Sequence, residues 1–173
     1  MQTSQIHLKS VDNLEQLGSL PSLAPDLIIA FGALNYFESP KLANALGKLV
    51  PSSALIGCST AGEIAVDRVY EGSCIVTAIK FANTRVAAVT TEIAGMTDSY
   101  GAGERLGHAL DHSNLTGVLL LGTGVAINGS ALVAGLESAL PEGVSISGGL
   151  AADAGAFKQT WTLGPAGNSD KHI

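Results

Sequence analysis

A loop of small polar residues and glycines follows a short apolar run at residues 54–64, which read ALIGCSTAGEI. Its thiol, hydroxyl and carboxylate groups belong to Cys58, Ser59, Thr60 and Glu63. In α/β proteins, a loop of this kind at the carboxyl end of a strand is where ligands bind. Gly57 and Gly62 let the backbone approach a bound molecule closely. The alternative interpretation is a tight turn whose hydroxyl groups satisfy neighbouring backbone groups.

Two further loops of small residues follow apolar runs, at residues 122–129 and 148–153. If the strands before the three loops are parallel, the loops meet at one edge of the sheet and line one pocket. The candidate ligand-binding residues of the last loop are Gly148, Gly149 and Asp153. Backbone N–H groups, hydroxyls and two carboxylates suit a small polar ligand better than a large apolar one.

A catalytic interpretation of the first loop is the main alternative. Residues 57–61, GCSTA, differ by one residue from the G-x-S-x-G elbow of serine hydrolases, and Ser59, Asp153 and His172 follow in the order of that class. A nucleophile elbow leads into a helix, however, whereas the residues after this loop lead toward a predicted hairpin. We therefore expect no catalytic residues, with a hydrolase that uses Ser59 or Cys58 as the alternative.

His108 and His112 are four residues apart in a segment predicted to be helical, so we expect them to share one helix face. Imidazole is a common axial donor to haem iron, and these two histidines are the candidate metal ligands if haem is bound. The alternative is a pair of solvent-facing histidines near a helix C-terminus, which the helix dipole favours. Cys58 and Cys74 form no C-x-x-C pair and so lack the usual spacing of a zinc site.

Hydrophobic periodicity predicts the elements that position these residues. Apolar or β-rich runs predict strands at residues 5–8, 26–32, 54–57, 73–81, 85–93, 118–121, 144–147 and 159–163. Amphipathic runs predict helices at residues 11–17, 40–49, 99–112 and 129–140. The short connection 82–84 predicts an antiparallel hairpin between the strands at 73–81 and 85–93. The expected fold class is α/β, a mixed β-sheet with helices packed on it and at least one antiparallel hairpin.

The length suits one domain with a substantial core. We expect that domain at residues 26–163, after an N-terminal segment at 1–25 and before a flexible tail at 164–173 whose composition favours loops. The formal net charge is −6 and the basic residues are scattered, which argues against a nucleic-acid partner. No apolar run approaches the roughly 20 residues of a membrane span, and the N-terminus lacks a signal-peptide pattern. We therefore expect no membrane insertion and a cytoplasmic protein.

Residues 56–64, IGCSTAGEI, resemble the signature of the FIST sensory domain, in its N-terminal half. The strand at residues 27–31 and the GGLAAD segment at 148–153 support this resemblance, which covers residues 26–163. The resemblance implies a non-enzymatic sensory domain of bacterial signal transduction that binds a small, amino-acid-like ligand and needs no cofactor.

Some members of this family resemble haem-based nitric oxide sensors that regulate a histidine kinase. The resemblance therefore implies haem as the alternative cofactor and a signalling protein, such as a histidine kinase, as a partner. A complete member has a C-terminal half that is missing here, so the resemblance also implies this half of the domain pair as a partner.

Overall fold

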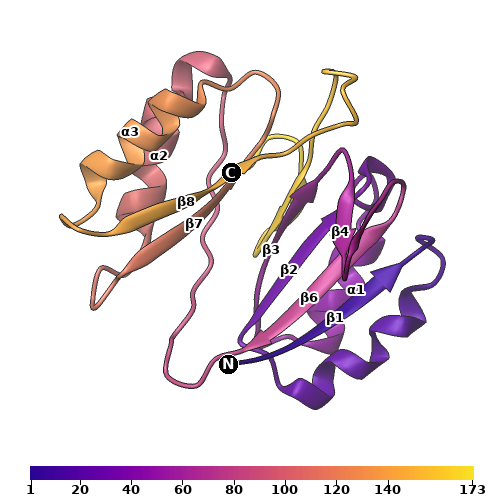
Figure 1. Ribbon diagram of the computed structural model, residues 1–173. Coiled ribbons are helices and arrows are strands. Elements are labelled where there is room, and N and C mark those ends of the chain that lie inside the picture. Colours follow the sequence, from indigo (N-terminus) through magenta and orange to yellow (C-terminus); the bar gives the residue numbers. More distant parts are fainter.

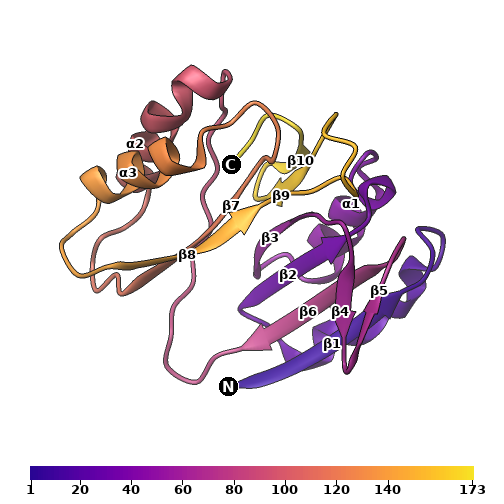
Figure 2. The same ribbon diagram turned by 45° about the horizontal axis from the view of Figure 1, so that its top comes forward.

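The computed structural model describes residues 1–173 and has a six-stranded sheet and a two-stranded sheet, each with helices on its outer side, and a third sheet that is a short two-stranded hairpin (Figure 1, Figure 2). The strands are β1 (Gln2–Leu8), β2 (Leu27–Gly32), β3 (Ala54–Ser59), β4 (Glu63–Ala65), β5 (Arg68–Tyr70), β6 (Cys74–Lys80), β7 (Gly117–Gly122), β8 (Ser145–Leu150), β9 (Thr162–Gly164) and β10 (Gly167–Ser169). The α-helices are α1 (Lys41–Leu49), α2 (Ser99–Ala109) and α3 (Gly129–Ala139). The 3-10 helices are η1 (Leu14–Leu23), η2 (Leu34–Tyr36) and η3 (Met96–Asp98). None of these helices has the length and apolarity needed to cross a membrane.

The larger sheet has the strand order β1-β6-β2-β3-β9-β10. β2 and β3 run parallel, whereas β6 lies between β1 and β2 and is antiparallel to both. β9 is antiparallel to β3 and forms a hairpin with β10, and β4 and β5 form a second hairpin. The prediction of a mixed α/β sheet with an antiparallel hairpin is therefore confirmed.

One face of the larger sheet is covered by η1 and α1. Ile28 and Ala30 of β2 are buried in the core on this face, together with Leu42 and Leu46, which lie one turn apart on α1. Because side chains alternate along a strand, Leu27 and Ile29 lie on the opposite face of the sheet. That second apolar face looks toward the smaller sheet and carries no helix of its own.

The smaller sheet is the parallel pair β7–β8, and α2 and α3 cover its outer face (Figure 1). Leu106 of α2 and Leu136 of α3 belong to the buried core on that face. The two helices touch backbone to backbone, because a Cβ added at Gly103 or Gly135 would overlap a backbone oxygen of the facing helix. Small residues at these two positions therefore set the distance between α2 and α3.

Residues 82–95, the crossing segment, run from the larger sheet to α2 (Figure 1). The predicted hairpin between 73–81 and 85–93 is wrong, because β6 already has β1 and β2 on its two edges and has no edge left for a third strand. Residues 91–93 instead pair with residues 171–173 through three backbone hydrogen bonds of 2.8 to 3.0 Å.

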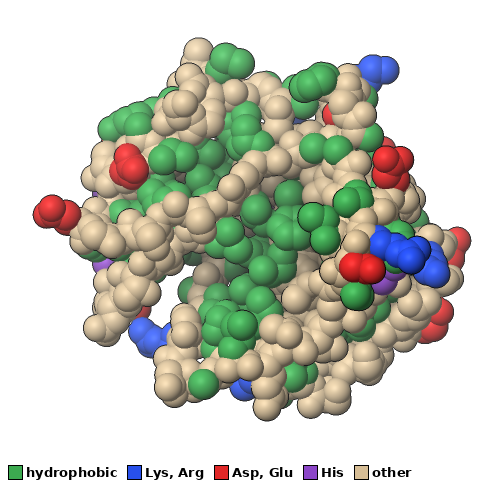
Figure 3. All heavy atoms as spheres, in the orientation of Figure 1, with side chains coloured by type: hydrophobic (Ala, Val, Ile, Leu, Met, Phe, Trp, Pro, Cys, Tyr) green, Lys and Arg blue, Asp and Glu red, His purple; other side chains and the backbone are tan.

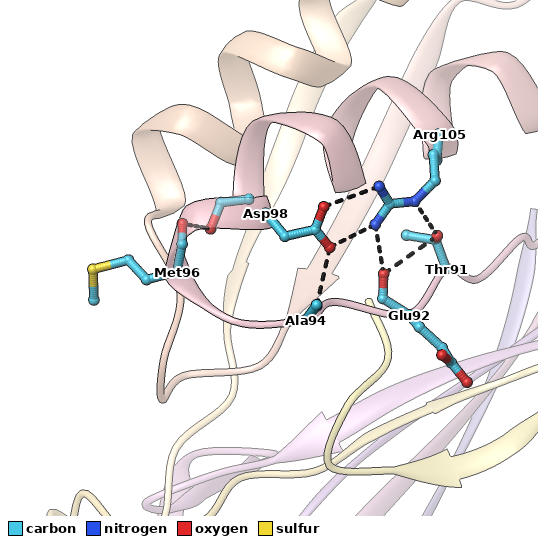
Figure 4. Close-up of polar contacts among 7 residues, drawn as sticks. Thr91, Glu92, Ala94, Met96, Asp98 and Arg105 are labelled. Atoms are coloured by element: carbon cyan, nitrogen blue, oxygen red, sulfur yellow. Dashed lines mark hydrogen bonds and ion pairs between the residues drawn. The ribbon is translucent and has the colours of Figure 1, made fainter.

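Arg105 of α2 anchors the end of the crossing segment (Figure 4). Its guanidinium group donates to both carboxylate oxygens of Asp98, at 3.0 and 2.8 Å. It also donates to Thr91 Oγ1 at 3.1 Å and to the Glu92 carbonyl oxygen at 2.8 Å. The two bonds from Arg105 to the Asp98 carboxylate, with a further one from the Ala94 amide, lower the pKa of Asp98 to about 2. One arginine thus ties the crossing segment to the helical side of the molecule.

Several predicted boundaries differ from the observed ones. α2 ends at Ala109, so the prediction of a helix through His112 is wrong. The helix expected at residues 11–17 is the 3-10 helix η1, shifted toward the C-terminus. Residues 164–173, expected to be a flexible tail, form β10 and the pairing with residues 91–93, and Ile173 is buried. Their composition favours loops, but pairing with a distant segment orders them.

Candidate functional site

The three glycine-containing loops meet at one edge of the sheets. The Ala152 amide donates to the Ser59 carbonyl oxygen at 2.8 Å, which joins the third loop to the first. The Ala151 amide donates to the Gly122 carbonyl oxygen at 2.8 Å, which joins the third loop to the second. We call this region, residues 57–63, 122–129 and 148–161, the loop junction. It connects the larger sheet to the smaller one.

Ser59 is fully buried at the end of β3. Its Oγ accepts a hydrogen bond from the Trp161 amide at 3.0 Å, and its own amide donates to the Trp161 carbonyl oxygen at 2.9 Å. Ser59 thus binds the segment that follows the third loop. Cys58 is also buried, and burial raises the pKa of its thiol to about 12, so the thiol stays protonated at neutral pH.

Glu63 is 2% exposed and is held entirely by neutral donors. Thr60 Oγ1 donates to Glu63 Oε1 at 2.8 Å, and Ser73 donates to Oε2 from its hydroxyl at 2.7 Å and from its amide at 3.1 Å. A buried carboxylate needs such partners to offset the loss of water. Glu63 therefore fastens the first loop to the start of β6.

The glycines of the first and third loops allow close backbone approach. A Cβ added at Gly57 would overlap the Ala30 carbonyl oxygen of the neighbouring strand, whereas Gly62 lies close to Tyr70 of β5. Gly148 and Gly149 lie inside β8 rather than after it, so the strand expected at 144–147 extends further than predicted. Gly148 has a φ of +143° and packs against the Leu120 backbone, while Gly149 faces open space.

Asp153 organises the turn that follows β8. Its carboxylate accepts hydrogen bonds from the amides of Phe157 at 2.9 Å, Lys158 at 2.7 Å and Gln159 at 3.2 Å. These backbone bonds hold the pKa of Asp153 below its ordinary value. The carboxylate is thus occupied within its own loop.

Thr123 is the junction residue that the sequence did not single out. It is 2% exposed, and its hydroxyl is buried without any hydrogen-bond partner. The neighbouring Gly124 amide donates to Thr160 Oγ1 at 2.8 Å, and a Cβ added at Gly124 would overlap the Ala151 carbonyl oxygen. The backbone N–H groups of residues 125–127 make no hydrogen bond within the chain. The only sequence signal for Thr123 is its place between two glycines after an apolar strand.

A deep apolar cleft of about 910 Å³ separates the inner faces of the two sheets. Figure 3 shows hydrophobic side chains gathered in a hollow between the helical layer and the larger sheet. The cleft is lined from the larger sheet by Leu27, Ile29, Ile56 and Ile79, from the smaller sheet by Leu119 and Leu121, and from the crossing segment by residues 83–90. A second cleft of about 600 Å³ lies between α1, the start of β3 and the β9–β10 hairpin. Neither cleft is lined by residues of the three loops.

The residues present do not fit haem. His108 is exposed on α2, and His112 Nε2 lies 2.8 Å from the Gly107 carbonyl oxygen beyond the end of that helix. The two histidines therefore do not share a helix face as expected. The cleft large enough for a macrocycle is lined by no His, Cys, Met or Tyr that could ligate its iron.

A family model described as the FIST N domain matches residues 26–171. Searches of curated proteins and of solved structures gave no match to this chain. FIST domains are sensory domains of signal transduction. The matched residues include the smaller sheet, every strand of the larger sheet except β1, the loop junction and the crossing segment. The chain therefore belongs to the FIST N domain family.

Proposed function

We propose that this sensory domain binds a small polar ligand of the amino-acid type at the loop junction and catalyses no reaction. The observation that carries the proposal is the Thr123 hydroxyl, which is buried there without a partner. Such an unpaired group destabilises a protein by about 1–3 kcal/mol. A ligand that hydrogen-bonds to Thr123 relieves this cost and so gains affinity.

The unpaired N–H groups of residues 125–127 supply the second half of the proposed site. They precede α3, and the start of a helix favours negative charge. A ligand carboxylate can accept hydrogen bonds from these donors while another polar group bonds to Thr123. The proposed ligand is therefore small and bears a carboxylate.

The other junction residues shape this proposed site. They are Gly57, Cys58, Ser59, Thr60, Gly62 and Glu63 from the first loop, and Gly148, Gly149 and Asp153 from β8 and the third loop. In this proposal Ser59, Glu63 and Asp153 hold the loops through the hydrogen bonds described above. Gly57 and Gly148 let neighbouring strands approach closely, and Gly149 faces open space.

The non-enzymatic part of the proposal rests on the first loop. The Ser59 hydroxyl is fully buried and bonded to a backbone amide, and the Cys58 thiol has a pKa of about 12. A nucleophile needs a partner base and access to substrate, and neither side chain has these.

The loop junction joins the two sheets, so a ligand there can change how the two halves of the molecule fit together. We propose that a signalling partner, such as a histidine kinase, responds to that change. The ligand can shift the equilibrium between two arrangements of the halves only by the difference between its binding free energies for them, and this difference limits the signal to the partner.

The test is a screen of the twenty L-amino acids and small dicarboxylates against the isotopically labelled protein, followed by amide NMR shifts. We expect at least one compound to saturate and to shift the amides of Gly62, Thr123 and residues 125–127. The Gly18 amide, in η1 on the far side of the larger sheet, serves as the internal control. No saturable binding, or shifts confined to other regions, would refute the proposal.

A further inference from the structure

The inner faces of the two sheets form a second place where a ligand can bind. Side chains of Leu27, Ile29 and Ile56 face Leu119 and Leu121 across the cleft of about 910 Å³. Leu119 remains 45% exposed, which is high for a leucine in a strand with an apolar sheet opposite. Apolar surface of this extent is stabilised when something fills the space and excludes water.

We propose that this cleft binds an aliphatic molecule with a carboxylate at one end, a ligand of the fatty-acid class. The inference is independent of the loop junction, because no residue of the three loops lines the cleft. It gives the domain a second, chemically different ligand site.

The size of the cleft is that of a small-molecule pocket. Ligand pockets typically enclose about 300–1,000 Å³, and this cleft lies within that range. A flexible alkyl chain can lie along its apolar walls and cover them.

The lining also indicates which end of the ligand is polar. Arg85 and Asp111 are the only charged residues of the cleft, and they form an exposed ion pair at 3.8 Å. The Arg85 side chain is 84% exposed, and Asp111 already accepts a hydrogen bond from the Ser113 amide at 2.9 Å. An exposed pair at this distance contributes little, so a ligand carboxylate can take the guanidinium group from Asp111 with two parallel hydrogen bonds.

The test is isothermal titration of the whole chain with dodecanoate, kept below its micelle concentration, and with dodecanol. We expect one dodecanoate to bind per chain. Leu119→Gln, which makes the cleft wall polar, is expected to weaken dodecanoate about tenfold. Arg85→Gln is expected to weaken dodecanoate about fivefold and to leave dodecanol unchanged.

Matched controls lie on the β4–β5 hairpin, away from the cleft. Val69 is 70% exposed and the Arg68 side chain is 74% exposed, so Val69→Gln and Arg68→Gln should bind dodecanoate like the wild type. Thr123→Val should also bind it like the wild type, which separates this site from the loop junction. Circular dichroism on each variant confirms that it is folded.

Three results would overturn the inference. The first is the absence of saturable one-to-one binding to the wild type. The second is equal loss of binding in the cleft variants and the hairpin controls, which would indicate non-specific adsorption. The third is a dimeric wild type that Leu119→Gln converts to a monomer, because a second copy would then cover the cleft.

Discussion

Polar side chains at the loop junction form hydrogen bonds that hold the loops in place, and Glu63 is the clearest case. In Glu63→Ala, the buried donors of Thr60 and Ser73 lose their acceptor. We expect the free energy of unfolding to fall by roughly 2–3 kcal/mol, because orphaned buried donors cost about 1–3 kcal/mol. Urea denaturation measures the change. Glu71→Ala, an exposed control nearby, should stay within about 0.5 kcal/mol of the wild type. An unchanged midpoint in Glu63→Ala would contradict the structural role.

Cys58 gives a second prediction at this scale. Both Cys58 and Cys74 are buried, and burial raises the pKa of each thiol to about 12. We expect neither thiol to react with Ellman's reagent in the native protein at pH 8, and both to react in denaturing urea. Rapid native reaction of Cys58, absent in Cys58→Ala, would revive the hypothesis of a thiol hydrolase.

Residue types predicted where the loops of the candidate site lie, but not which polar side chains in them are already hydrogen-bonded. The sequence places Ser59 and Glu63 in one loop, yet only long-range contacts with Trp161 and Ser73 decide that their polar groups are occupied. Thr123 could not be singled out, because an unpaired hydroxyl is a property of its surroundings rather than of its residue type.

Close backbone contacts at glycines hold helices and strands together. We expect the contact between α2 and α3 to be the most sensitive to substitution. In Gly135→Ala, the new methyl group would overlap the Tyr100 carbonyl oxygen, and we expect a loss of about 2–3 kcal/mol. Gly47 also lies in a helix, α1, but has open space around it. Gly47→Ala should therefore stabilise the protein by about 0.5–1 kcal/mol. Thermal and urea unfolding of the two variants provide the comparison, and shifts of the same sign would argue against the packing described.

The anchor of the crossing segment has a measurable pH dependence. Because the folded-state pKa of Asp98 is about 2, below its ordinary value near 3.9, the Asp98–Arg105 bond contributes stability at pH above about 4. That contribution is lost as the pH falls from about 4 toward 2. In Arg105→Gln, we expect the Asp98 carboxyl to titrate at a higher pH, as measured by NMR. Arg68→Gln should leave the Asp98 titration unchanged, and an equal shift in both variants would exclude a direct pairing.

Local sequence patterns predicted most helices and strands. The predictions that were wrong have a common cause. β2, β3, α1 and α3 follow from apolar periodicity and capping, including the Asn128 side chain that accepts from the Ala131 amide at 3.1 Å. The false hairpin at 73–93 and the ordering of residues 164–173 both depend on which strand edges are already occupied. Pairing between distant segments is a property of the assembled sheet, so periodicity within a segment cannot reveal it.

At the scale of the whole molecule, the loop junction and the crossing segment join two sheets whose inner faces stay apart. The sequence indicates that each face is apolar, but not that they oppose each other across a cleft. In the two proposals made above, a ligand at the junction or in the cleft would act on the contact between the two halves, as a sensory domain requires. Population shifts of that kind require a ligand that binds one arrangement more tightly than the other.

The central claim, that the loop junction is the ligand site, is tested most directly by Thr123→Val in one experiment with two readouts. Removing an unpaired buried hydroxyl should leave the melting temperature of the free protein unchanged or raise it by a few degrees. The same substitution should weaken the amino acid or dicarboxylate found in the screen about tenfold, whereas Thr97→Val, at an exposed position in η3, should change neither readout. A free protein that melts well below the wild type, or ligand affinity that is unchanged in Thr123→Val, would contradict the account.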